Sequence, residues 1–147
     1  MKYVILFFML VIAPASFANE LNGTWKGLGT FKSSSMGLDE MTTFKIKLIQ
    51  SSTSLITEIC WEVEHSSYTA NMCSNSEMEI KNGTELWAQN HYLGTISKNF
   101  IDIHLSEVDF SIDETIQLKP DGALDYMYKI VEPQSSIEQN AVGLVKL

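Results

Sequence analysis

The chain has 147 residues, 45% of them hydrophobic, and a formal net charge of −8 without a single arginine. An acidic chain of this kind argues against binding to nucleic acid or to anionic lipid. The absence of arginine also removes the usual bidentate clamp for phosphate and carboxylate groups.

The first 18 residues have the pattern of a secretory signal peptide. Lys2 precedes nine apolar residues at 4–12, and Ser16-Phe17-Ala18 forms a small-residue cleavage site before Asn19. This apolar run is too short to span a membrane. We therefore expect a mature chain of residues 19–147, with 9 basic against 18 acidic residues, that forms one domain. Because no cysteine closely follows the apolar run, we expect no lipid anchor. The mature chain should be free in the periplasm or outside the cell.

Residues 21–32 alternate as a half-buried strand does. Trp25, Gly27, Gly29 and Phe31 fall on one face, and polar residues and Leu28 fall on the other. Glycines between two aromatic residues leave room for a second backbone or a bound molecule to come close.

Gly23-Thr24-Trp25 resembles the G-x-W signature of the lipocalins and their calycin relatives, avidins included. The resemblance covers about a dozen residues, and only Gly23 and Trp25 carry over, in a structural role. It implies an up-and-down barrel with the tryptophan closing its floor. One feature departs from the family, in which a late arginine packs across that tryptophan, because this chain has no arginine.

Further alternating segments follow. Residues 33–41 are expected to form a loop, either a lid over a barrel mouth or an ordinary connection. Residues 42–50 and 55–64 are expected to be strands. A two-residue turn at Ser66-Ser67 would pair position i with 133 − i, placing Cys60 opposite Cys73 on the outer face. In an exported chain this register predicts a disulfide.

The second half continues the pattern. Asn82-Gly83 predicts a type I′ hairpin between 77–81 and 84–92, where a bulge would reconcile two conflicting apolar faces. Further strands are expected at 100–106, 111–118 and 123–131, with 133–139 as a connection and 141–147 as a closing strand. The turn at Pro120-Asp121-Gly122 pairs i with 242 − i, so Glu114 faces Tyr128. About eight to ten strands predict an all-β protein: one antiparallel up-and-down barrel, or alternatively a two-sheet sandwich.

An aromatic interior is the first candidate site, and it is either a ligand pocket or a filled core. Glu114 belongs to this candidate site, because a carboxylate on an apolar face needs a hydrogen-bond partner, an ion pair or a proton. The alternative is that Glu114 sits in water at the rim of the barrel. The candidate ligand-binding residues are Trp25, Phe31, Phe44, Trp61, Glu114, Tyr126 and Tyr128.

Catalytic and metal signatures are sparse. No nucleophile elbow, phosphate loop, zinc helix or dinucleotide motif is present. A tight turn at Ser97-Lys98 would oppose His91 and His104 with Asp102 nearby, a possible zinc pair, but ordinary surface histidines are the favoured interpretation. We expect no metal, no cofactor and no enzymatic activity.

The favoured function is therefore an exported barrel that holds a small apolar or aromatic ligand in an aromatic cup, oriented by Glu114 and a tyrosine. The alternative is a periplasmic protein-binding module or enzyme inhibitor with a filled core. It would offer an acidic patch of Asp39, Glu40, Glu58, Glu62 and Glu64 to a basic partner. An isomerase or cyclase that uses Glu114 is a third interpretation.

Overall fold

A computed structural model describes residues 21–65 and 68–147. The predicted signal peptide and the Ser66-Ser67 turn lie outside these residues. The described part of the chain contains no helix with the length and apolarity needed to cross a membrane.

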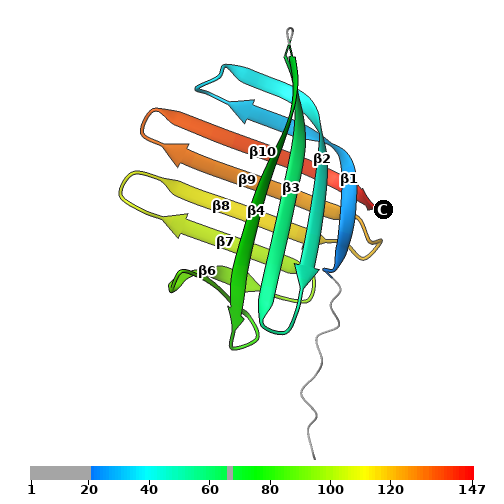
Figure 1. The fold of residues 1–147 in the computed structure, drawn as a ribbon, viewed down its shortest axis with the longest axis vertical. Coiled ribbons are helices and arrows are strands. Elements are labelled where there is room, and N and C mark those ends of the chain that lie inside the picture. The colour runs from blue at the N-terminus through cyan, green and yellow to red at the C-terminus, as the bar shows by residue number, and fades with distance from the viewer. Residues whose placement is uncertain (1–20, 66–67) are drawn as a thin grey trace, which may run out of the picture.

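Ten antiparallel strands close into one up-and-down barrel in the order β1-β10-β9-β8-β7-β6-β5-β4-β3-β2 (Figure 1). The predicted all-β barrel is confirmed, and the sandwich is not formed. The strands are β1 (Gly23–Ser33), β2 (Leu38–Gln50), β3 (Ser54–His65), β4 (Tyr68–Lys81), β5 (Glu85–Ala88), β6 (His91–Ile96), β7 (Phe100–Ser106), β8 (Ser111–Leu118), β9 (Leu124–Glu132) and β10 (Ser135–Lys146).

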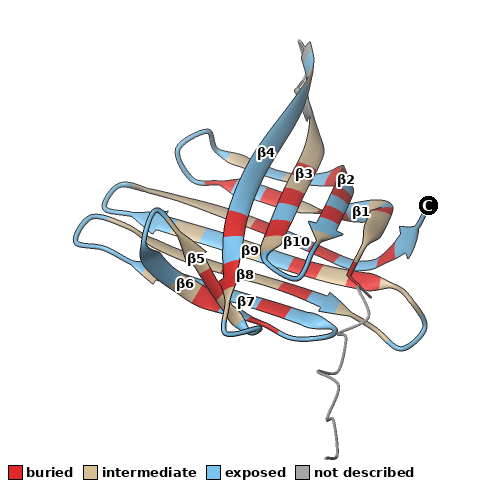
Figure 2. Cartoon of the chain, turned by 60° about the horizontal axis from the view of Figure 1, so that its bottom comes forward, coloured by how far each residue is buried: buried red, intermediate tan, exposed pale blue. Residues whose placement is uncertain are grey.

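Side chains that alternate between the two faces of each strand build the core. Along β1, Trp25 and Phe31 are buried whereas Lys26, Leu28 and Lys32 are exposed, and the same two-residue period places the buried bands of the other strands inside the barrel (Figure 2). The room at the β1 glycines is taken by β10. A Cβ on Gly29 would lie 2.5 Å from the carbonyl oxygen of Asn140, so glycine here permits barrel closure.

Two hairpin registers are confirmed. β3 pairs with β4 at 133 − i, and β8 pairs with β9 at 242 − i through a turn in which Gly122 has a φ of +85°. β10 pairs with β1 and closes the barrel, as predicted for the C-terminal segment.

Three predicted elements are wrong. Residues 33–41 are not a loop throughout, because β1 runs to Ser33 and β2 already begins at Leu38. Residues 84–92 are not one strand, because Gln89 and Asn90 take positive φ angles and turn the chain between β5 and β6. The hairpin at Asn82-Gly83, where a bulge was expected, pairs without a register shift, and the irregularity lies in the hairpin of β5 and β6, between Leu86 and Trp87. Residues 133–139 are not merely a connection, because β10 already begins at Ser135 and pairs with β9 from there.

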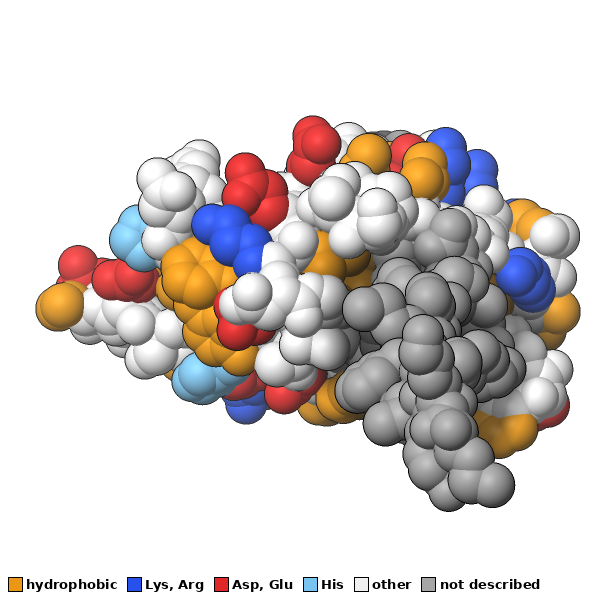
Figure 3. All heavy atoms as spheres, turned by 90° about the horizontal axis from the view of Figure 1, so that it is seen from below, with side chains coloured by type: hydrophobic (Ala, Val, Ile, Leu, Met, Phe, Trp, Pro, Cys, Tyr) orange, Lys and Arg blue, Asp and Glu red, His pale blue; other side chains and the backbone are white. Residues whose placement is uncertain are grey.

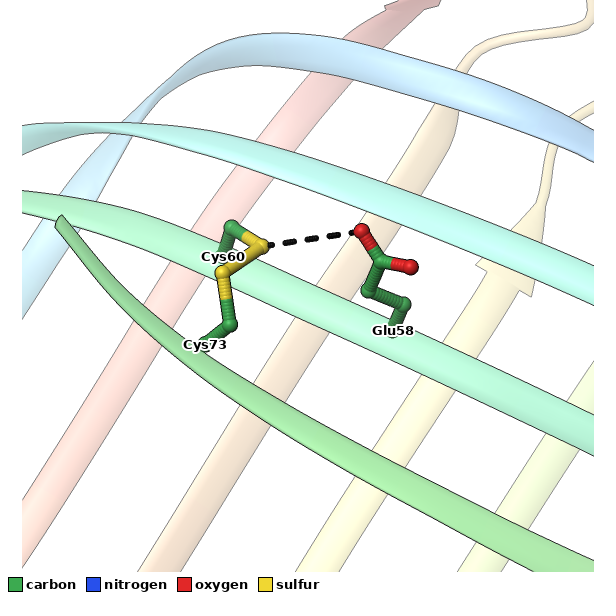
Figure 4. Close-up of a disulfide and its surroundings, with 3 residues drawn as sticks. All are labelled: Glu58, Cys60 and Cys73. Carbon is green, nitrogen blue, oxygen red and sulfur yellow. Dashed lines mark hydrogen bonds between the residues drawn. A yellow bond between two sulfur atoms is a disulfide. The ribbon is translucent and has the colours of Figure 1, made fainter.

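The disulfide joins Cys60 and Cys73, which are directly paired on β3 and β4 with their Cα atoms 4.1 Å apart. It lies between the two strands beside Glu58 (Figure 4). A carboxylate oxygen of Glu58 is 3.9 Å from the Cys60 Sγ. Because a disulfide sulfur carries no hydrogen, this is a contact and not a hydrogen bond.

Reduction of the Cys60–Cys73 bond is expected to lower the free energy of unfolding by about 2–3 kcal/mol, since it releases a short covalent loop in the unfolded chain. The backbone ladder remains, so the barrel is expected to stay folded. Guanidinium unfolding with and without reductant measures the loss, and intact mass should show a gain of two hydrogens. Two free thiols in the protein before reduction would contradict the bond.

Candidate functional site

The barrel interior is hollow toward the end that carries the loop between β1 and β2. The cavity there has a volume of about 150 Å³, enough for a molecule of about the size of benzene. Its wall combines four aromatic, four aliphatic and five polar side chains. They are Phe31, Trp61, Tyr126 and Tyr128; Met36, Ile59, Met72 and Ile137; and Thr57, Ser74, Ser76, Glu114 and Gln139.

The cavity opens to solvent beside β4. Met72, Ser74 and Ser76 line it and are nevertheless exposed, with Met72 at 41% of its full accessibility. The reason lies in the sheet: β4 pairs with the short β5 only from Glu79 to Lys81. In the described part of the chain, the preceding residues of β4 pair with β3 alone. Met36, from the loop between β1 and β2, also borders the cavity, as a lid residue would.

Glu114 is the central polar group of this wall. Burial leaves it 9% exposed, and its Oε1 has no hydrogen-bond partner in the structure. β8 places it between Ile103 of β7 and Tyr128 of β9, as the hairpin register predicted. Burial disfavours the charged form and raises the pKa of the Glu114 carboxyl from 4.5 to about 7. The group therefore changes its charge near neutral pH.

Two tyrosines of β9 lie beside Glu114. Burial raises the pKa of Tyr126 well above its ordinary value and that of Tyr128 to a smaller extent, and the Glu114 charge raises both further. Both tyrosines are therefore neutral near pH 7. The Tyr126 hydroxyl donates a 2.9 Å hydrogen bond to Oε1 of Gln139, which leaves the Gln139 amide nitrogen as a donor.

Trp61 is the second residue of the wall with an unsatisfied polar atom. Its ring stacks on Phe31 with centroids 6.0 Å apart, and its Nε1 is buried without an acceptor. A native interior rarely leaves buried polar groups without partners. Here the two such side-chain atoms of the described residues belong to Trp61 and Glu114, and both residues line one cavity.

The structure divides the predicted site residues into two groups. Phe31, Trp61, Glu114, Tyr126 and Tyr128 line the cavity. Trp25 and Phe44 are fully buried in the packed core instead, and Phe44 meets Tyr126 at 6.0 Å between ring centroids. The interior is thus a filled core at one end and a cavity at the other.

Gln139 is a cavity residue that sequence reasoning missed, because residues 133–139 were expected to be a connection. The signal available in the sequence was that Gln139 lies two residues after Ile137 and so shares its face of a strand. Thr57, in the middle of the predicted strand 55–64, also faces inward, and its hydroxyl lies 2.6 Å from that of Ser76.

The predicted opposition of His91 and His104 is wrong. The chain turns one residue later than expected, at Lys98-Asn99, where the Ser97 N–H donates a 2.8 Å hydrogen bond to the Phe100 carbonyl. β6 and β7 therefore pair at 197 − i, with Ile96 opposite Ile101. His104 instead hydrogen-bonds Asp113 on the neighbouring strand. Among the described residues, no three His, Cys, Asp or Glu side chains are grouped to hold a metal ion.

Two acidic residues of the predicted patch lie beside lysines. Asp39 forms a 3.0 Å ion pair with Lys32, and Glu58 is paired in register with Lys47. The face seen in Figure 3 likewise shows both signs of charge interspersed. A mixed surface of this kind gives little long-range attraction to a basic partner.

A scan against protein-family models finds no match, and a search of curated proteins finds no similar sequence.

Proposed function

We propose that this protein is an exported small-molecule-binding barrel that holds a small apolar or aromatic compound in the cavity between β3, β4, β8 and β9. The carrying observation is the combination of a cavity of about 150 Å³ with a buried Glu114 carboxyl that has an unpartnered oxygen in its wall. Four aromatic side chains supply the apolar contact.

Binding in this cup would follow from desolvation. The ligand's apolar part leaves water and contacts Phe31, Trp61 and Tyr128, while Glu114 sets its orientation. Apart from the open side at β4, the cavity wall belongs to paired strands of the barrel, so little ordering is needed on binding. We propose binding and no reaction.

The resemblance to the calycins supports this proposal. The closed antiparallel barrel is compatible with that fold, and Trp25 lies at the packed end, where its Nε1 donates to the carbonyl of Gly122. The Lys146 amino group lies 5.1 Å from the centre of the Trp25 ring.

Native mass spectrometry of the mature protein, purified from the compartment to which it is exported, is expected to show a reproducible small-molecule adduct. Ser74→Phe places a ring in the cavity and is expected to remove the adduct, because the wall position then fills the space. Ser74→Ala removes only the hydroxyl and should retain the adduct.

An adduct that persists in Ser74→Phe would lie outside the cavity and contradict the proposal. If no adduct survives purification, a millimolar fragment screen read by NMR decides. If none of the fragments shifts the Trp61 indole or Tyr128 signals, a ligand site in this cavity is rejected. A co-purifying protein in place of a small molecule would favour the inhibitor interpretation.

A further inference from the structure

We propose that the ligand of this cavity is a small organic cation, an amine with one aromatic or apolar group, whose ammonium group pairs with Glu114. This inference rests on the proposed function and names its substrate class.

The first argument is the charge of the wall. Of the described residues that line the cavity, Glu114 is the single one with a carboxyl group, and none is a lysine or histidine. An anionic ligand would enter a low-dielectric space beside a like charge with no counter-ion. A cation meets the opposite charge of Glu114 there.

The second argument is that Glu114 has no internal partner. On β9, the hydroxyl of Tyr126 is already given to Gln139. On β7 the paired residue is Ile103, which has no polar side chain. A buried carboxyl oxygen without a partner is costly, so a bound donor would remove that cost. An ammonium group supplies up to three N–H donors and a positive charge.

The third argument is the aromatic content of the wall. Phe31, Trp61, Tyr126 and Tyr128 border the same cavity as Glu114. Ring faces attract ammonium groups by about 0.5–2 kcal/mol each, most strongly where water is excluded. The same rings pack against the apolar part of an amine. A volume of about 150 Å³ limits that part to about one ring.

The titratable groups that face Glu114 determine how binding depends on pH. Tyr126 and Tyr128 of β9 stay neutral near pH 7. The described cavity residues of β1, β3, β4 and β10 do not titrate in this range, and His104 and Asp113 are exposed partners of one another. Glu114, with its pKa of about 7, is thus the group that changes charge. A cation binds its ionised form, so binding should strengthen as the pH rises through 7.

The experiment uses three probes of nearly equal shape: benzylamine, benzyl alcohol and benzoate. Each is titrated into the mature protein at pH 6 and pH 8, with binding followed by NMR. Benzylamine is expected to bind about tenfold more tightly at pH 8 than at pH 6, because the ionised fraction of Glu114 rises by about that factor. At pH 8 it should also bind at least about tenfold more tightly than benzyl alcohol, and benzoate should not bind.

Glu114→Gln keeps the shape of the side chain and is expected to abolish both the benzylamine preference and its pH dependence. Glu77→Gln, the same change on the exposed face of β4, should alter neither. Benzyl alcohol binding that equals that of benzylamine, or benzylamine binding that weakens toward pH 8, would overturn this inference and leave the proposed function standing. Failure of all three probes to shift any cavity signal would reject both. The comparison of benzylamine binding at pH 6 and pH 8 uses the native protein, so it tests the inference even if Glu114→Gln does not fold.

Discussion

Glu114→Gln is expected to become more stable than the native protein as the pH rises from about 5 to about 8. Burial raises the pKa of Glu114 from 4.5 to about 7, so the folded state retains a proton that the unfolded chain has released. The stabilisation from that proton is fully present below pH 4.5 and is lost as the pH rises through 7. The free energy of unfolding of the native protein should therefore fall by up to about 3 kcal/mol across this window relative to the variant.

Urea unfolding of both proteins at several pH values measures this difference, and the comparison removes the effects of other groups. Glu138, for example, has a pKa lowered by its hydrogen bond from Lys129, so its contribution is lost as the pH falls, equally in both proteins. Glu77→Gln is the control and should follow the native curve. Parallel pH curves for Glu114→Gln and the native protein would show that Glu114 titrates as an exposed carboxyl does.

Trp25→Ala is expected to lower the free energy of unfolding by about 3–5 kcal/mol, among the largest effects of any single substitution here. The Trp25 side chain is fully buried, and its Nε1 donates a 3.0 Å hydrogen bond to Gly122, 97 residues away. Removing the ring leaves a cavity at the packed end of the barrel and an unpaired carbonyl at the turn between β8 and β9. Urea denaturation monitored by far-UV circular dichroism measures the loss.

Trp87→Ala supplies the matched control. Trp87 is only half-buried and packs on the barrel exterior against Tyr92, with ring centroids 5.7 Å apart. Trp87→Ala should lower the free energy of unfolding by less than half as much as Trp25→Ala, because a partly exposed ring buries less apolar surface. Equal losses for the two variants would show that the packed end contributes nothing special to stability.

The sequence predicted best where a short turn and strict alternation coincide. The 242 − i register follows from the turn at Pro120-Asp121-Gly122, and β8 and β9 pair in that register, with Glu114 opposite Tyr128. Prediction failed where the turn lacks glycine. Gln89-Asn90 reverses the chain with two non-glycine residues at positive φ, amid apolar residues that resemble one continuous strand. The histidine pair failed because the turn between β6 and β7 lies one residue later than expected, which shifts every partner by two positions along the ladder.

By itself, the sequence determined the fold class, the disulfide pairing and, along the clearly alternating segments, which side chains point inward, because a strand's two-residue period sets the direction of each side chain. The tertiary structure alone decided how deep each inward residue lies. Trp25 and Trp61 both face inward, yet one is sealed in the core and the other lines the cavity. Depth depends on the stagger of ten strands around a closed barrel and on the short β5, which leaves the inner face of β4 open to solvent. Local alternation contains no information about either.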